Sequence, residues 1–166
     1  MMSDYHLEPI KPEDTELIYF MRSISKSKVL KPTDRIINQM FIRGFLENNE
    51  GGYLKFCNSK EIVGYYRWQN NDERVTIGSW ITNPSSGFKE KILFDLEFKL
   101  FVFNNTGADY LFFEVERNNS SVWKHHERLG AELIKEDRIE RHYRLSRVVF
   151  KYKYNEKINR FNQRTI

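Results

Sequence analysis

The chain has 166 residues, of which 40% are hydrophobic and 30% charged, and its 13 Phe, 9 Tyr and 3 Trp exclude a disordered chain. This length is enough to bury one core, so we expect a single domain over residues 1–166. The formal net charge of +4 is modest and the basic residues match no nucleic-acid-binding motif, so we expect no nucleic-acid partner. Because Cys57 is the one cysteine, an internal disulfide is excluded. The sequence has no cluster of Cys and His residues with the spacing of a zinc site. It also has no apolar run long enough to span a membrane. With a polar start in place of a signal sequence, these features predict a cytoplasmic protein without a metal or a membrane partner.

The first 50 residues are predicted to form a strand and two helices. The strand covers residues 5–10 and ends near two prolines, and a helix opens at residues 13–14, where acidic side chains suit the helix dipole. Residues 22–31 read as a polar connection. A second helix follows residue 34, carries apolar residues at helical spacing as far as Leu46, and ends at the Asn- and Gly-rich residues 48–52.

Three strands of an antiparallel meander follow, predicted over residues 52–58, 61–69 and 74–82. Polar turns at residues 58–60 and 70–73 separate them. Cys57 lies in an alternating apolar pattern, where a small buried thiol is the simplest interpretation.

The second half of the sequence alternates helices and strands. A loop over residues 83–87 leads into an amphipathic helix over residues 88–103, and a strand over residues 110–116 leads into a short helix that begins near residues 119–121 and ends at Gly130. Strands at residues 132–136 and 139–145 come next. A last helix and a basic tail occupy about residues 146–166.

The segment between residues 114 and 131 resembles a known family. Asn119, Val122, His126, Gly130 and Ala131 match, at the same spacings, a strand-to-helix segment of the GCN5-related N-acetyltransferases (GNAT), which usually reads Asn, Ala, Tyr, Gly, Phe. The resemblance is to the branch that acetylates nucleotide-linked amino sugars, related to the ribosomal-protein acetyltransferases. It implies an α+β fold with a mixed, mostly antiparallel sheet, in which the central strands at residues 74–82 and 110–116 splay apart between flanking helices.

The resemblance also implies acetyl-coenzyme A as cosubstrate. In the family the pantetheine arm enters the splay, and the pyrophosphate meets a loop of the pattern Arg or Gln, two residues, Gly, one residue, Gly or Ala. Here those positions hold Ser86, Lys89 and Lys91, so the glycines are missing. Without glycine the loop backbone approaches the pyrophosphate less closely, and the lysine charges could compensate for this. Backbone amides at a helix start can still hold phosphate. The residues expected to contact the cofactor are Ile81, Thr82, Asn83, Ser86, Gly87, Phe88, Lys89, Lys91 and Asn119.

Two residues are candidates for the proton transfers. Glu114 interrupts an otherwise apolar strand on the side of the splay, so it is the candidate base, with an outward or salt-bridged carboxylate as the alternative and Glu116 as the second candidate. His126 takes the place of the tyrosine that protonates the leaving thiolate in the family, and imidazole titrates near neutral pH. The alternative is that His126 is a structural histidine whose ring makes its hydrogen bonds within the protein. His125 is expected to point to a different face of the helix.

The acceptor is expected to be an amine on a nucleotide-linked amino sugar of surface-polysaccharide synthesis. Aromatic faces suit a nucleotide base or a sugar ring, and Tyr66, Trp68 and Trp80 lie on the predicted meander. Arg22 or Lys28 could contribute a charge. Two alternatives stay open, namely acetylation of a protein N-terminus or lysine, and a non-catalytic module that binds coenzyme A or a partner. The sequence leaves open whether the chain forms a homodimer.

Overall fold

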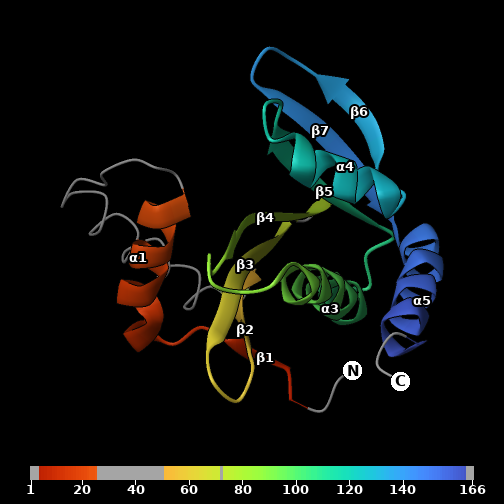
Figure 1. Cartoon of the computed structure of the whole chain (residues 1–166). Coiled ribbons are helices and arrows are strands. Elements are labelled where there is room, and N and C mark those ends of the chain that lie inside the picture. Colours follow the sequence, from red (N-terminus) through yellow and green to blue (C-terminus); the bar gives the residue numbers. More distant parts are fainter. Residues whose placement is uncertain (1–3, 26–50, 72, 164–166) are drawn as a thin grey trace. The chain divides into compact units, whose positions relative to one another are not determined.

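A computed structural model describes residues 4–25, 51–71 and 73–163 of the chain (Figure 1). These residues belong to two compact units. The N-terminal unit comprises residues 2–69 and 79–99, and the C-terminal unit comprises residues 70–78 and 100–166 together with residue 1. Along the chain the elements are β1 (His6–Pro9), a 3₁₀ turn (Pro12–Asp14), α1 (Thr15–Ser25), β2 (Gly51–Cys57), β3 (Ile62–Asn71), β4 (Arg74–Thr82), α3 (Phe88–Thr106), β5 (Tyr110–Glu116), α4 (Ser120–Arg128), β6 (Glu132–Glu136), β7 (Glu140–Ser146) and α5 (Arg147–Gln163).

The seven strands are hydrogen-bonded in the order β1-β2-β3-β4-β5-β7-β6. Neighbours β1 and β2, β2 and β3, β5 and β7, and β6 and β7 are antiparallel, whereas β4 and β5 are parallel. The expected fold class, an α+β architecture with a mixed and mostly antiparallel sheet, is therefore confirmed. No helix among the residues described is long and apolar enough to cross a membrane.

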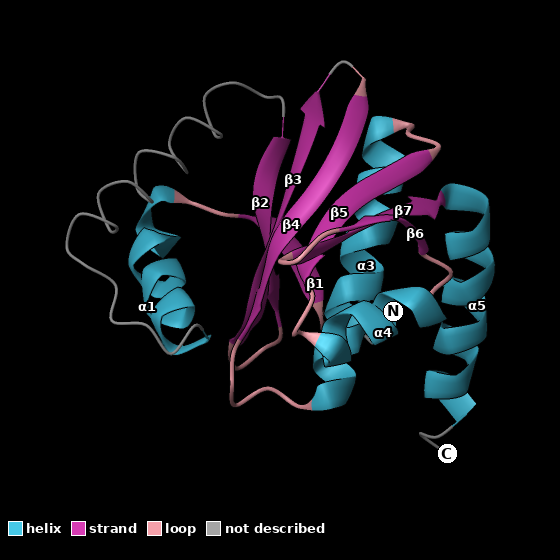
Figure 2. Cartoon of the chain, turned by 90° about the horizontal axis from the view of Figure 1, so that it is seen from above, coloured by secondary structure: helices cyan, strands magenta, loops and turns pink. Residues whose placement is uncertain are grey.

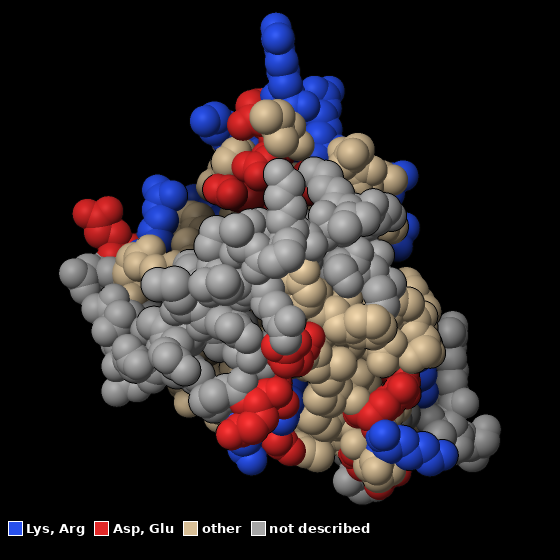
Figure 3. Space-filling model, turned by 90° about the vertical axis from the view of Figure 1, so that its left-hand side faces the viewer, with Lys and Arg blue, Asp and Glu red and all other residues tan. Residues whose placement is uncertain are grey.

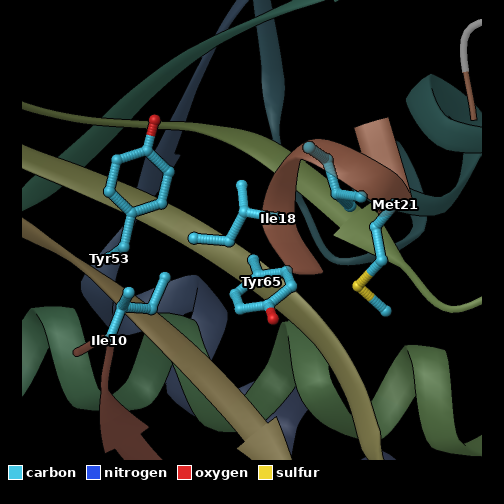
Figure 4. Close-up of a cluster of buried hydrophobic side chains, with 6 residues drawn as sticks. Ile10, Ile18, Met21, Tyr53 and Tyr65 are labelled. Carbon is cyan, nitrogen blue, oxygen red and sulfur yellow. The ribbon is translucent and has the colours of Figure 1, made fainter. Parts of the chain in front are cut away.

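In the N-terminal unit, helices α1 and α3 cover opposite faces of the strands (Figure 2). Alternation along β3 explains this arrangement, because successive side chains of a strand point to opposite faces. Tyr65 joins a buried cluster with Ile18 and Met21 of α1 (Figure 4). Tyr66 points to the other face, where its ring stacks on Phe98 of α3 with centroids 3.8 Å apart.

The α3 face of this unit also holds a buried ion pair. Lys99 Nζ lies 2.5 Å from both carboxylate oxygens of Asp95, and the Tyr66 hydroxyl donates a hydrogen bond of 3.0 Å to the same carboxylate. All three side chains are buried. Burial lowers the pKa of Lys99 against the opposing effect of Asp95, and burial, with Asp95 second, raises the pKa of Tyr66 well above its usual value.

In the C-terminal unit, β5 alternates between buried and exposed residues, with Leu111, Phe113 and Val115 buried. Helix α4 runs over the β5–β7–β6 strands, and α5 lies beside the end of α3 (Figure 1), where Phe103 and Phe150 have ring centroids 5.4 Å apart. These contacts give the unit a core of its own.

Glycine at position 130 is required by the packing of α5. Gly130 follows α4 with φ +91°, in the left-handed region that favours glycine. A Cβ atom at this position would also lie 2.3 Å from Cγ1 of Val149 in α5. The same residue therefore ends α4 and lets α5 pack closely.

Most predicted elements are confirmed, some with shifted bounds. The strands at residues 74–82, 110–116 and 132–136 have the predicted bounds, whereas α3 continues to Thr106. Residues 22–25 belong to α1, so the predicted polar connection was wrong over that stretch. Residues 13–14 form a 3₁₀ turn and the α-helix begins at Thr15. The second predicted helix, after residue 34, lies outside the described residues.

Candidate functional site

Strands β4 and β5 are joined by a short ladder. Val75 pairs with Leu111 and Thr76 pairs with Phe112, and no further pair joins these two fully described strands. Beyond this point, residues 113–116 of β5 continue to pair with β7. Within the C-terminal unit, Ile77 and Gly78 of β4 therefore run on without partners on β5. A parallel pair that ends this early leaves main-chain groups available to an added strand or strand-like ligand.

A left-handed residue follows directly in β4. Ser79 has φ +55°, which is uncommon for any residue with a Cβ atom. Such a residue inside a strand is typical of a bulge, which ends regular pairing and redirects the side chains that follow. Backbone strain of this kind clusters at functional sites. Trp80, Ile81 and Thr82, the last residues of β4, come immediately after it.

The loop between β4 and α3 is organised by Asn83. Its backbone N–H donates to Val63 O at 2.7 Å, and its side-chain oxygen accepts from the Ser85 N–H and hydroxyl at 3.1 and 2.8 Å. Asn83 O in turn accepts from the Ser86 N–H at 3.0 Å. The side chain of Asn83, expected at the cofactor, thus shapes the loop through these hydrogen bonds.

Ser86 and Gly87 bring this loop to the start of α3. The Ser86 hydroxyl is buried and has no hydrogen-bond partner among the residues described. A Cβ atom at Gly87 would meet nothing within 4 Å, so the space beside its backbone is open. The first amides of α3 have no acceptor inside the helix, because helical hydrogen bonding begins one turn later. The Ser86 hydroxyl and the first backbone N–H groups of α3 therefore lie together as hydrogen-bond donors at the start of this helix.

Charged side chains of both signs surround the same helix end. Lys89 is exposed and Lys91 is half-buried. Glu90 Oε2 accepts from the Gly87 N–H at 3.1 Å, as a helix-capping glutamate does, and Glu90 Oε1 accepts from the Tyr5 hydroxyl at 2.6 Å. The hydrogen bond to Glu90 is the main cause that raises the pKa of Tyr5. One amide of the helix start is thus already satisfied by the protein.

The aromatic residues expected at the acceptor differ in their placement. Tyr66 is buried and its hydroxyl bonds to Asp95, so it belongs to the core. Its ring also stacks on the ring of the half-buried Trp80, with centroids 5.7 Å apart, and so helps to hold the Trp80 side chain in place. Trp68 is also half-buried. Arg22 lies in α1, but its side chain and all of Lys28 are outside the described part of the chain.

In the C-terminal unit, Glu114 lies on the exposed face of β5 and faces a histidine. Its carboxylate oxygen is 3.3 Å from Nδ1 of His142, the residue directly opposite on β7. The Glu114 side chain is 58% exposed and that of His142 only 22%. The other ring nitrogen of His142 is 3.5 Å from the Asp137 carboxylate. Backbone hydrogen bonds from the Glu140 and Ile139 amides are the main cause that lowers the pKa of Asp137.

His126 lies on the opposite, buried face of β5. Its ring centroid is 4.6 Å from that of Phe113 and 5.2 Å from that of His125. Both histidines are buried. Asn119 precedes α4 and is exposed, with no capping hydrogen bond from its side chain. Its side-chain oxygen accepts a long hydrogen bond of 3.4 Å from the Ser121 hydroxyl, and its backbone N–H donates to Glu116 O at 2.9 Å.

A separate groove opens near the start of β5 in the C-terminal unit. It has a volume of about 380 Å³, and its lining comes from the ends of β3 and α3 and the starts of β4 and β5. Arg74 lines it with its guanidinium 4.7 Å from the ring centroid of Phe112. None of the residues predicted for the site lines this groove.

Charges of both signs mix on the surface. Figure 3 shows one face, on which Lys and Arg atoms lie beside Asp and Glu atoms in each charged region. Among the described residues, ion pairs such as Arg144–Glu132 at 2.8 Å and Arg141–Glu127 at 3.3 Å follow the same pattern. The net positive charge is thus partly neutralised locally.

Solved structures resemble this fold over nearly its whole length. The apo structure of FdhC, a nucleotide-linked sugar GNAT, is 24% identical with a TM-score of 0.79, over 96% of this chain and 93% of FdhC. The Campylobacter jejuni N-acetyltransferase PseH in complex with acetyl coenzyme A is 16% identical with a TM-score of 0.69, over 86% of this chain and 99% of PseH. The chain has the fold of the GNAT acetyltransferases.

A match at lower identity is the structure of mutant forms of the Vibrio cholerae spermidine/spermine N-acetyltransferase SpeG. That structure is 9% identical with a TM-score of 0.74, over 91% of this chain and 98% of SpeG. No protein-family model matches the sequence, and no curated protein matches it either.

Three residues of the site were missed by the sequence analysis. His142 is separated from Glu114 by 28 positions and meets it only through the β5–β7 register, and no local pattern marks it. Ser79 adopts φ +55° without being glycine, although the adjacent Gly78 was a weak signal for a bulge. Glu90 had a recognisable signal, because a glutamate three residues after a loop residue is typical of a helix cap.

Proposed function

We propose that this chain is an N-acetyltransferase that transfers the acetyl group of acetyl-coenzyme A to an amine of a nucleotide-linked amino sugar. The observation that carries the proposal is the two-pair ladder between β4 and β5, followed at once by the left-handed Ser79. The early end of this ladder leaves strand edges available in the C-terminal unit, and the N-terminal unit holds a helix start whose amides can receive phosphate.

The residues at the start of α3 fit the phosphates of acetyl-coenzyme A. The buried Ser86 hydroxyl lacks a partner among the described residues, the space beside Gly87 is open, and Lys89 adds an exposed positive charge. Glu90 occupies one amide and adds a negative charge, so the remaining amides and Lys89 would carry the binding. When bound, acetyl-coenzyme A supplies the acetyl group as a reactive thioester.

The chain's own side chains would move the protons. An attacking amine must lose a proton, and Glu114 is the proposed acceptor, with His142 at 3.3 Å to stabilise or relay the charge. His126 is proposed to protonate the sulfur of the leaving group. Its buried place against Phe113 holds the ring in a fixed orientation, which favours efficient proton transfer. The exposed Asn119 amide would hydrogen-bond the pantetheine arm.

Two lines of support favour an amino sugar as acceptor. FdhC, the match with 24% identity, is a nucleotide-linked sugar GNAT. The half-buried Trp68 and Trp80 offer aromatic surface in the N-terminal unit. Aromatic faces of this kind suit sugar rings and bases.

Two measurements test the proposal. Calorimetry with acetyl-coenzyme A should show saturable binding, and thiol release should then be fastest with a nucleotide-linked amino sugar among amino sugars, polyamines and peptides. The absence of saturable binding at millimolar cofactor would instead identify a degenerate interaction module. Binding with turnover on peptides alone would overturn the sugar acceptor in favour of a protein acetyltransferase.

A further inference from the structure

Three different metal-ligating side chains meet at the edge of the sheet in the N-terminal unit. In the antiparallel register of β1 and β2, His6 lies opposite Cys57 and Glu8 lies opposite Lys55. Residues two apart on a strand share a face, so all four side chains lie on the same face. One ligand atom from each of His6, Glu8 and Cys57 lies within 4.8 Å of the other two.

The chemistry of this cluster is specific. Imidazole nitrogen, carboxylate oxygen and thiolate sulfur are the three ligand types that zinc uses in proteins, and three protein ligands leave a fourth tetrahedral position for water. With zinc bonds of about 2.0–2.3 Å, tetrahedral ligand atoms lie about 3.3–3.8 Å apart. The ligand atoms span up to 4.8 Å, whereas His6 Nε2 and Glu8 Oε1 are only 2.5 Å apart, so side-chain rotations would have to bring Cys57 closer to these two groups and separate them from each other.

The side chains that would have to rotate are the exposed ones. His6 is 52% exposed and Glu8 37%, and they already contact each other, with His6 Nε2 2.5 Å from Glu8 Oε1. Cys57 is buried and provides a fixed anchor. With two exposed ligands around one buried ligand, a tetrahedral site would form by rotation of the His6 and Glu8 side chains.

Nearby charges permit a cation here. Lys55 Nζ lies 3.6 Å from Glu8 but binds both carboxylate oxygens of Asp14 more closely, at 3.0 and 3.1 Å. Asp14 is thus the closer counterion of Lys55, and Glu8 would exchange its contacts with Lys55 and His6 for contact with the ion. A thiolate and the Glu8 carboxylate would together neutralise a divalent ion.

We propose that His6, Glu8 and Cys57 bind one divalent ion of the zinc class, with solvent in the fourth position. Binding forms a sulfur–metal bond as the Cys57 thiol releases its proton to solvent. The ion would link the edge strand β1 to β2. This site is independent of the proposed acetyl transfer, because none of its ligands is among the residues assigned to that reaction.

Cobalt substitution tests the site with a direct readout of the sulfur ligand. Cys57 is the only cysteine of the sequence, so a thiolate-to-cobalt charge-transfer band in the near ultraviolet can come from this residue alone. We expect the untagged 166-residue chain to bind one equivalent of Co²⁺ with this band and to lose the band when Zn²⁺ is added. The absence of the band at millimolar Co²⁺ would overturn the proposal.

Variants separate this site from another cluster. Cys57→Ser should abolish the band, and His6→Ala and Glu8→Gln should each weaken Zn²⁺ binding about 10- to 100-fold, a range known for losses around a metal site. His142→Ala is the matched control, because Glu114, Glu140 and His142 form a second group of suitable ligand atoms on the C-terminal unit. Zn²⁺ binding that is lost in His142→Ala but kept in His6→Ala would refute the site. His6→Ala, exposed on an edge strand, keeps the test valid even if Cys57→Ser does not fold.

Discussion

At the scale of single residues, the two candidates for proton transfer lie on opposite faces of one strand. Glu114 points to the exposed face of β5 and meets His142, whereas His126 packs against Phe113 on the buried face. Phe113 and Glu114 are adjacent in β5, so alternation places their side chains on opposite faces, and His126 of α4 packs on the face of Phe113. A base open to solvent and an acid held in a packed environment suit an amine that arrives from solvent and a leaving group that is enclosed.

We expect His126→Gln to lower kcat by about 10²- to 10⁴-fold, the usual range for loss of a general acid, with little change in the Kd of acetyl-coenzyme A. Steady-state kinetics and calorimetry measure the two quantities. His125→Gln is the matched control on the neighbouring buried residue and should retain most of the turnover. Wild-type kcat in His126→Gln would remove this residue from the mechanism.

Glu114→Gln should lower kcat/KM most strongly for acceptors whose amines are largely protonated at neutral pH. The loss should shrink as pH is raised, because a neutral amine needs no base. Glu116→Gln, an exposed carboxylate two residues further along the same strand face, is the control and should stay near wild type. A pH profile of kcat/KM that is identical in wild type and Glu114→Gln would contradict the assignment.

Cys57 allows a test of burial that needs no substrate. Burial is the main cause that raises the pKa of its thiol from 9.0 to about 11. Only the thiolate reacts with iodoacetamide, so two pKa units correspond to an about 100-fold lower thiolate fraction at pH 8. We expect metal-free folded protein to be alkylated at least ~100-fold more slowly than protein unfolded in urea. Equal rates would mean that Cys57 is exposed.

At the scale of elements, glycines position the helices of the C-terminal unit. Gly107 ends α3 with φ +70° and Gly130 ends α4 with φ +91°, so each closes a helix with a left-handed residue. They differ in their surroundings. A Cβ atom at Gly107 would meet nothing within 4 Å, whereas at Gly130 it would collide with Val149.

This difference predicts unequal effects of the same substitution. Gly107→Ala should reduce the free energy of unfolding by about 1–2 kcal/mol, the strain of a left-handed alanine. Gly130→Ala should cost about 1–3 kcal/mol more, because overpacking is added to that strain. Urea denaturation measures both. Adding Val149→Ala should recover part of the loss in Gly130→Ala only, and a loss of equal size in both single variants would contradict the predicted clash.

At the scale of the whole molecule, the sequence predicted the elements better than the contacts between them. Strand bounds at residues 74–82 and 110–116 were correct because alternation and turn residues are local signals. The placement of Tyr66 in the core and the pairing of Glu114 with His142 depend on register and on which face a helix covers. Register and helix placement depend on contacts between residues that are distant in sequence, so a local sequence pattern does not predict them.

Ligand binding should register in the stability of the whole protein. A ligand at about 100 times its Kd adds about 2.7 kcal/mol to the free energy of unfolding, which raises the Tm of a chain of this size by about 5–11 °C. We expect this shift with acetyl-coenzyme A in a thermal unfolding assay. Lys89→Ala should reduce the shift, and Lys60→Ala, in the turn between β2 and β3, should not. No shift at millimolar acetyl-coenzyme A would count against the cofactor.

The brief ladder between β4 and β5 has a consequence for amide hydrogen exchange. Residues 113–116 of β5 are held by β7, but the amides of Ile77 and Gly78 have no partners on β5. Amide hydrogens on that side of β4 should exchange with deuterium much faster than those of the β5–β7 ladder. A cofactor that lies along β4 like an extra strand would slow their exchange, so a mass-spectrometric deuterium map would reveal its path residue by residue.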